Sequence, residues 1–115
     1  MNLITFKEKL SNQPTEIEFT DTMAVIDENY EFTPTAFVNG DTNNKANENN
    51  GSCKLFAFAQ LQNLSTEQTL HCFGKYYTKD VLKNPEGNDH QNIRNFIQYG
   101  WEGIKFEGNA LKSKN

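Results

Sequence analysis

The sequence is short of basic charge, and this shortage excludes two classes of partner. Arg94 is the single arginine among 115 residues, and acidic residues outnumber lysine and arginine by 15 to 11, for a formal charge of −4. Binding to a nucleic-acid backbone or to an anionic membrane surface needs clustered lysine and arginine. We therefore expect no nucleic-acid partner and no membrane partner.

Cysteine and long apolar runs are also scarce. Cys53 and Cys72 are the two cysteines, which suits free thiols in a reducing compartment better than a disulfide scaffold. No run approaches the roughly 20 apolar residues of a membrane span. Lys7, Glu8 and Lys9 lie where a signal peptide would need an apolar stretch. We therefore place the protein in the cytoplasm.

The sequence also lacks the signatures of common cofactors and metals. It has no phosphate-binding P-loop, dinucleotide fingerprint, zinc-finger spacing or serine-hydrolase elbow. Zinc accepts cysteine and histidine, but the neighbours His71 and Cys72 would diverge by roughly 100° around a helix axis. A calcium loop beginning at Asp41 would have Ala46 in place of glycine and Ser52 in place of glutamate. We expect no cofactor and no metal.

Bulky apolar residues are present in sufficient number for a core. Nine phenylalanines, four tyrosines and one tryptophan make up 12% of the chain, a content that disordered chains lack. A chain of 115 residues has the usual length of one domain. We predict a single domain over residues 1–115 and expect a monomer.

Two helices are predicted in the first 30 residues. Apolar residues at steps of three and four mark a first helix that stops before Pro14. The same spacing marks a second helix from Phe19 to Tyr30, with Thr20 or Asp21 as its expected cap.

A third helix is predicted from Cys53 to about Asn63, with Ser52 as its cap. It is apolar on nearly every side, so we expect it at the centre of the core. A fourth helix follows, because Ser65 and Gln68 have the spacing of a capping box.

A fifth helix is predicted to open at Asp89 as its N-cap and to end at Gly100. Trp101 follows this glycine, at the position where a Schellman motif folds a side chain back onto the helix. We expect Trp101 to be a core residue that packs on Phe96.

Extended segments are few. Phe32–Val38 is aromatic and β-branched, which indicates an extended segment. Gly103–Glu107 alternates apolar and charged residues and is predicted to pair with Thr35–Val38. Residues 39–51 hold six asparagines and no large apolar side chain, which predicts a mobile surface loop. Residues 112–115 are expected to form a flexible tail. The predicted fold is α+β, mostly helical, with about five helices and a minimal two-stranded sheet.

One candidate site lies at the start of the third helix, in Asn49, Gly51, Ser52, Cys53 and Lys54. The first N–H groups of a helix and its positive dipole end can hold an anion. The same position beside Lys54 would lower the pKa of Cys53 and favour the nucleophilic thiolate.

A cysteine enzyme would also need a base. His71 and His90 are the two histidines, and Asp80 or Asp89 could orient either one. The sequence does not show that any of them comes near Cys53.

A second candidate site comprises Asp89, His90 and Arg94. His90 and Arg94 are four residues apart on one helix face, and together they could grip a carboxylate or a phosphate. The alternative is an internal salt bridge from Arg94 to Asp80 or Glu102.

The order of several sequence blocks resembles the HopJ type III effector family, over about residues 15–111. The blocks are Thr33–Gly40, Asn49–Phe56, Leu70–Tyr77, Asp80–Leu82, Asp89–Phe96 and Gly100–Phe106. The resemblance implies a bacterial protein, either one injected into a host cell by a type III system or one with a housekeeping role. It implies no particular activity, substrate or catalytic residue.

Two hypotheses of function remain open. The first is a binding or interaction module that holds a small anionic ligand or an unknown protein through the two candidate sites. The second is a small enzyme with Cys53 as nucleophile and His90 or His71 as base.

Overall fold

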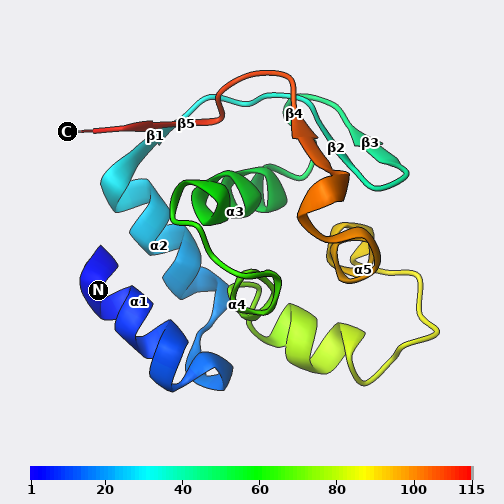
Figure 1. Ribbon diagram of the computed structural model, residues 1–115, viewed down its shortest axis with the longest axis horizontal. Coiled ribbons are helices and arrows are strands. Elements are labelled where there is room, and N and C mark those ends of the chain that lie inside the picture. The colour runs from blue at the N-terminus through cyan, green and yellow to red at the C-terminus, as the bar shows by residue number, and fades with distance from the viewer. Residues whose placement is uncertain (115) are drawn as a thin grey trace.

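A central helix, α3 (Asn50–Leu61), organises the core. The computed structural model describes residues 1–114, and Figure 1 shows α2 on one side of α3, α5 on the other and strands along a third side. Phe56 and Phe58 in α3 are fully buried, which confirms the predicted central position of this helix. The Phe56 ring contacts four rings from other elements, those of Phe37, Phe73, Phe96 and Trp101.

The N-terminal part contains the two predicted helices, α1 (Leu3–Asn12) and α2 (Phe19–Asn29), joined by the 3-10 turn η1 (Pro14–Glu16). The N-cap of α2 is Glu18 and not Thr20 or Asp21. The prediction failed because Asp21 acts from inside the helix, where its carboxylate accepts the backbone N–H of Glu18.

The C-terminal part is also mostly helical. It comprises α4 (Thr66–His71), the π-helical segment η2 (Tyr76–Val81), α5 (Gln91–Tyr99) and the 3-10 turn η3 (Gly100–Gly103). The capping box at the start of α4 is present as predicted.

The end of α5 agrees with the sequence, but its start does not. Gly100 closes the helix with a φ of +64°, and the ring of Trp101 lies 4.9 Å from that of Phe96, as expected. The N-cap of α5 is His90 and not Asp89. His90 adopts a left-handed φ of +50°, and Asp89 is instead paired with a side chain of α5.

The strands form two small sheets. In the first, β1 (Tyr30–Phe32) pairs antiparallel with β5 (Leu111–Ser113). In the second, β2 (Phe37–Asn39) lies between β3 (Thr42–Asn44) and β4 (Ile104–Phe106). The fold is α+β and mostly helical, as predicted.

The predicted pairing of Thr35–Val38 with Gly103–Glu107 is confirmed, since Phe37 lies opposite Phe106. The sequence underestimated the strands, because the additional ones carry little apolar patterning. Lys112 and Ser113, expected in a flexible tail, continue strand β5, and Lys114 donates its backbone N–H to Asn29. Asn115, the last residue of that expected tail, lies outside the described residues.

The asparagine-rich stretch 39–51 is not a surface loop throughout. It contains β3 and the start of α3, and Asn39 and Asn44 are 0% and 3% exposed. Burial of amides is tolerated where they hydrogen-bond to one another. The stretch therefore contributes polar residues to the interior.

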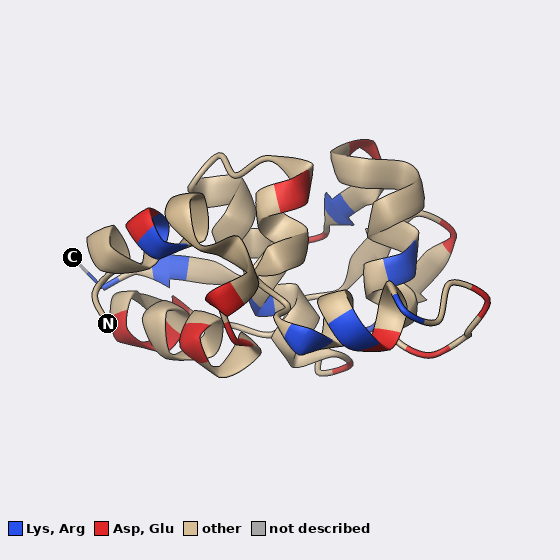
Figure 2. Cartoon of the chain, turned by 90° about the horizontal axis from the view of Figure 1, so that it is seen from below, with Lys and Arg blue, Asp and Glu red and all other residues tan. Residues whose placement is uncertain are grey.

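Acidic and basic residues are interspersed in the view of Figure 2. Several form ion pairs between elements, such as Lys54 with Asp27 and Lys75 with Glu18. Within residues 1–114, none of the helices is long and apolar enough to cross a membrane.

Candidate functional site

The starts of α3 and α5 meet at one cleft of about 470 Å³. Its lining includes Gly51 and Ser52 from α3 and Gln91 and Asn92 from α5. The N-caps of both helices, Asn49 and His90, line it too. The cleft is therefore built around two helix N-termini that lie far apart in the sequence.

Five N–H groups at these helix starts have no acceptor among the described residues. In α3 they belong to Asn50, Gly51 and Ser52, and in α5 to Gln91 and Asn92. Neither N-cap supplies a side-chain acceptor. By contrast, Ser65 caps α4 by accepting the backbone N–H of Gln68 at 3.1 Å. The two helix starts on the cleft thus retain their donors and their positive dipole ends.

A network of buried asparagines holds the two helix starts together. Asn44 of β3 accepts hydrogen bonds from the Asn49 side chain at 2.8 Å and the Asn92 side chain at 3.1 Å. Asn39 of β2 donates to the Asn92 backbone oxygen at 2.8 Å, and Asn95 donates to the Asn39 backbone oxygen at 3.0 Å. Each helix start is therefore bonded to the same β2–β3 hairpin.

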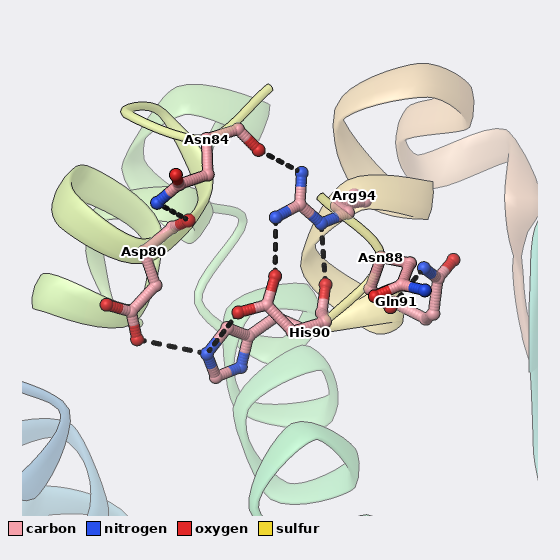
Figure 3. A network of polar contacts seen from close by, with 7 residues as sticks. Asp80, Asn84, Asn88, His90, Gln91 and Arg94 are labelled. Carbon is pink, nitrogen blue, oxygen red and sulfur yellow. Dashed lines mark hydrogen bonds and ion pairs between the residues drawn. The ribbon is translucent and has the colours of Figure 1, made fainter. Parts of the chain in front are cut away.

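His90 presents one ring nitrogen to carboxylates and leaves the other free. Its Nε2 lies 3.0 Å from Asp80 Oδ2 and 3.8 Å from Asp89 Oδ2. Figure 3 shows Nδ1 on the side of the ring away from the Asp80 carboxylate. Among the described residues Nδ1 has no hydrogen-bond partner, and the side chain is 30% exposed. An imidazole held in this way can offer Nδ1 to a ligand.

Comparison with known proteins places the chain in a family. A model of the HopJ type III effector protein family matches residues 3–111. This chain belongs to the HopJ family. The match begins nearer the N-terminus than the blocks from residue 15 onward had indicated.

A solved structure has the same fold. The crystal structure of VPA0580, a protein of unknown function, is 60% identical in sequence, with a TM-score of 0.97 over 99% of this chain and 95% of that chain. No curated protein matches this chain. None of these comparisons assigns an activity to the HopJ fold.

The structure brings together only part of the first predicted site. Asn49, Gly51 and Ser52 line the cleft. Cys53 is 1% exposed and its thiol lies 3.7 Å from the Thr35 carbonyl, to which it donates. Lys54 does not line the cleft but pairs with Asp27.

The predicted activation of Cys53 is wrong. Burial raises the pKa of the Cys53 thiol, and this effect outweighs the opposing hydrogen bond with Thr35. Lys54 does not stabilise a Cys53 thiolate, because its ammonium lies 3.0 Å from Asp27 and 5.0 Å from the centre of the Phe32 ring. The surroundings of Cys53 therefore favour the thiol over the thiolate.

His71 is also outside the cleft. Its ring packs edge-on against Tyr77 at 5.4 Å, its Nε2 lies 4.0 Å from Glu67, and its buried Nδ1 has no partner in the described part of the chain. Of the two candidate bases, only His90 lines the cleft. Within residues 1–114, no cluster of three or more His, Cys, Asp or Glu is placed to hold a metal ion.

One prediction placed Arg94 beside His90 as a ligand-binding residue. In the structure its guanidinium binds groups of the chain itself. Its Nε donates to the Asp89 carbonyl at 2.6 Å, Nη1 donates to the Asn84 carbonyl at 2.9 Å, and Nη2 binds the Asp89 carboxylate (Figure 3). The alternative salt bridge had named Asp80 or Glu102, and neither is the partner. Arg94 instead holds the loop that precedes His90.

Some residues that line the cleft were not identified as site candidates from the sequence. Phe19, Phe73 and Tyr76 supply aromatic lining, and Asn92 supplies a backbone donor. Apolar spacing had identified Phe19 only as part of the second predicted helix. Aromatic residues at helical spacing carry no signal that separates a core from a binding cleft.

Both thiols should be unreactive in the folded protein. Burial raises the pKa of Cys53 and raises that of Cys72 to about 12. Because the thiolate is the reactive form, iodoacetamide should label each cysteine at least about 100-fold more slowly in buffer than in urea. Single Cys→Ala variants assign the two rates. Fast labelling of Cys53 with a midpoint near pH 6 would restore it as a candidate nucleophile.

Asp89→Asn should destabilise the protein in a pH-dependent way. A hydrogen bond from Arg94 lowers the pKa of Asp89 below its ordinary value of 3.8. The contribution of this carboxylate is therefore complete above its unfolded-state pKa and is lost as the pH falls through the lower folded-state pKa. The Tm difference between wild type and variant should stay constant from pH 7 to about pH 4 and shrink below. A difference that disappears between pH 7 and pH 5 would contradict this assignment.

Proposed function

We propose that this HopJ protein binds a small anion in the cleft between α3 and α5. The observation that carries the proposal is the set of four unpaired backbone N–H groups of Gly51, Ser52, Gln91 and Asn92, residues of two helix starts that line one cleft. A helix N-terminus attracts anions through such donors and through its dipole, and residues of two helix N-termini line the same cleft here.

The side chains around the cleft fit an anion held mainly by backbone groups. Within residues 1–114, no aspartate, glutamate, lysine or arginine lines it. Ser52 and Gln91 supply polar side chains, and His90 supplies a free Nδ1. Nε2 of His90 faces Asp80 and Asp89, and in the doubly protonated ring Nδ1 is a second donor. A carboxylate or phosphate oxygen can accept from Nδ1 and from the helix starts together.

The compartment forms part of the proposal. We infer that the protein works in the cytoplasm of the cell that makes it, supported by two buried free thiols with no disulfide among the described residues. Delivery into a host cell is the alternative, which the name of the HopJ effector family suggests.

Inorganic phosphate is the simplest probe of this proposal. Titration at constant ionic strength, followed by amide chemical shifts, should give saturable changes that are largest at Gly51, Ser52, Gln91 and Asn92. The amide of Gln68 should not respond, because the side chain of Ser65 already accepts this N–H at the start of α4. Shifts that never saturate, or that are largest elsewhere, would contradict an anion site at these helix starts.

Two variants identify the binding groups. His90→Gln should weaken phosphate binding roughly 10-fold or more, the effect of one lost charged hydrogen bond. Lys54→Gln is the control, because Lys54 is a basic residue near the start of α3 but pairs with Asp27. This variant should bind phosphate with unchanged affinity. A large loss of affinity would show that Lys54, and not the backbone donors, holds the anion.

A further inference from the structure

We propose that the ligand of the cleft carries an aromatic ring beside its anionic group. This inference rests on the proposed anion site and names the chemical class of its ligand, an aromatic phosphate or carboxylate. It is carried by a continuous wall of protein rings that adjoins the helix starts.

The ring wall consists of Phe73, Phe19, Tyr76 and His90, all of which line the cleft. Phe19 and Phe73 are stacked, with ring centres 6.2 Å apart and planes within 12°. Tyr76 meets Phe19 edge-on at 5.3 Å, and its ring centre lies 5.2 Å from that of His90. Each ring touches the next, so the wall extends from the core to the one imidazole of the cleft.

The wall touches the α3 start. A Cβ atom added at Gly51 would lie 2.8 Å from Cζ of Phe19, so the backbone of the first turn and the ring edge are already in contact. An anionic group that accepts from the Gly51 and Ser52 N–H groups would therefore place its attached atoms against Phe19 and Tyr76. Glycine at position 51 makes this close approach possible.

The cleft also has room for more than an inorganic anion. Its volume of about 470 Å³ falls within the range of small-molecule sites, about 300–1,000 Å³. Tyr76 is 45% exposed, although it is a large aromatic residue between two other rings. A planar ligand ring would cover this exposed surface and gain the edge-on or offset contacts that aromatic pairs favour. A flat ring fits the wall better than an aliphatic chain for the same reason.

The test compares two phosphate monoesters that share charge and differ in the ring. Phenyl phosphate should bind the wild-type protein roughly 2- to 10-fold more tightly than methyl phosphate, the factor expected from one aromatic contact. Isothermal titration or amide shifts measure both affinities. Equal affinities would overturn this inference and leave the anion site intact, whereas absence of binding by either monoester would overturn both.

Tyr76→Leu tests the wall itself, because leucine keeps apolar bulk and removes the ring. It should bring the affinity for phenyl phosphate down to the affinity of the same variant for methyl phosphate. Tyr99→Leu is the matched control, since Tyr99 is another exposed tyrosine, 39% exposed, and lies outside this cleft. Circular dichroism confirms that both variants are folded. An advantage that survives in Tyr76→Leu, or that is lost in Tyr99→Leu, would overturn the assignment of the ring site.

Discussion

The arrangement of the molecule around its cleft depends on hydrogen bonds between buried asparagine side chains. Asn44 accepts from the side chains of Asn49 and Asn92, which belong to the starts of two different helices. An amide is both donor and acceptor, so one residue can bind several elements at once. Asn44 thereby fixes the β2–β3 hairpin to α3 and α5.

This arrangement has an electrostatic cost. The N-terminus of each helix carries a partial charge of about +0.5, and two such ends at one cleft repel each other. The Asn39 Oδ1 atom is also buried without a donor in the described part of the chain. The paired amides offset these costs in the absence of ligand, and an anion in the cleft would relieve the repulsion. A strained polar arrangement of this kind is typical of binding sites.

Much of the fold follows from local sequence patterns. Apolar spacing gives the helices, Ser65 and Gln68 give the start of α4, and Trp101 folds back onto Phe96 as expected. These features depend on residues close together in the chain. The role of Asn44 does not, because its partner Asn92 is 48 residues away. A run of asparagines therefore predicts a polar loop until its partners are known.

The candidate site, like the fold, was predicted only in part from the sequence. Gly51, Ser52 and His90 were candidates, and the structure places all three on the cleft. Cys53 and Lys54 were candidates for the same reason, but successive helix residues point about 100° apart. These two side chains therefore turn away from the face that Gly51 and Ser52 present. The left-handed conformation of His90 and the loop held by Arg94 arise from tertiary contacts that no local pattern reveals.

The most direct test of the account is the phosphate affinity of an Asn44→Ala variant, because Asn44 is 3% exposed and does not line the cleft. If the asparagine network sets the positions of the two helix starts, the folded variant should bind phosphate about 10-fold more weakly, the equivalent of one lost hydrogen bond. Asn43→Ala is the matched control, since its exposed side chain lies outside the network, and it should bind as the wild type does. A folded Asn44→Ala protein with wild-type affinity would show that the cleft does not depend on the network.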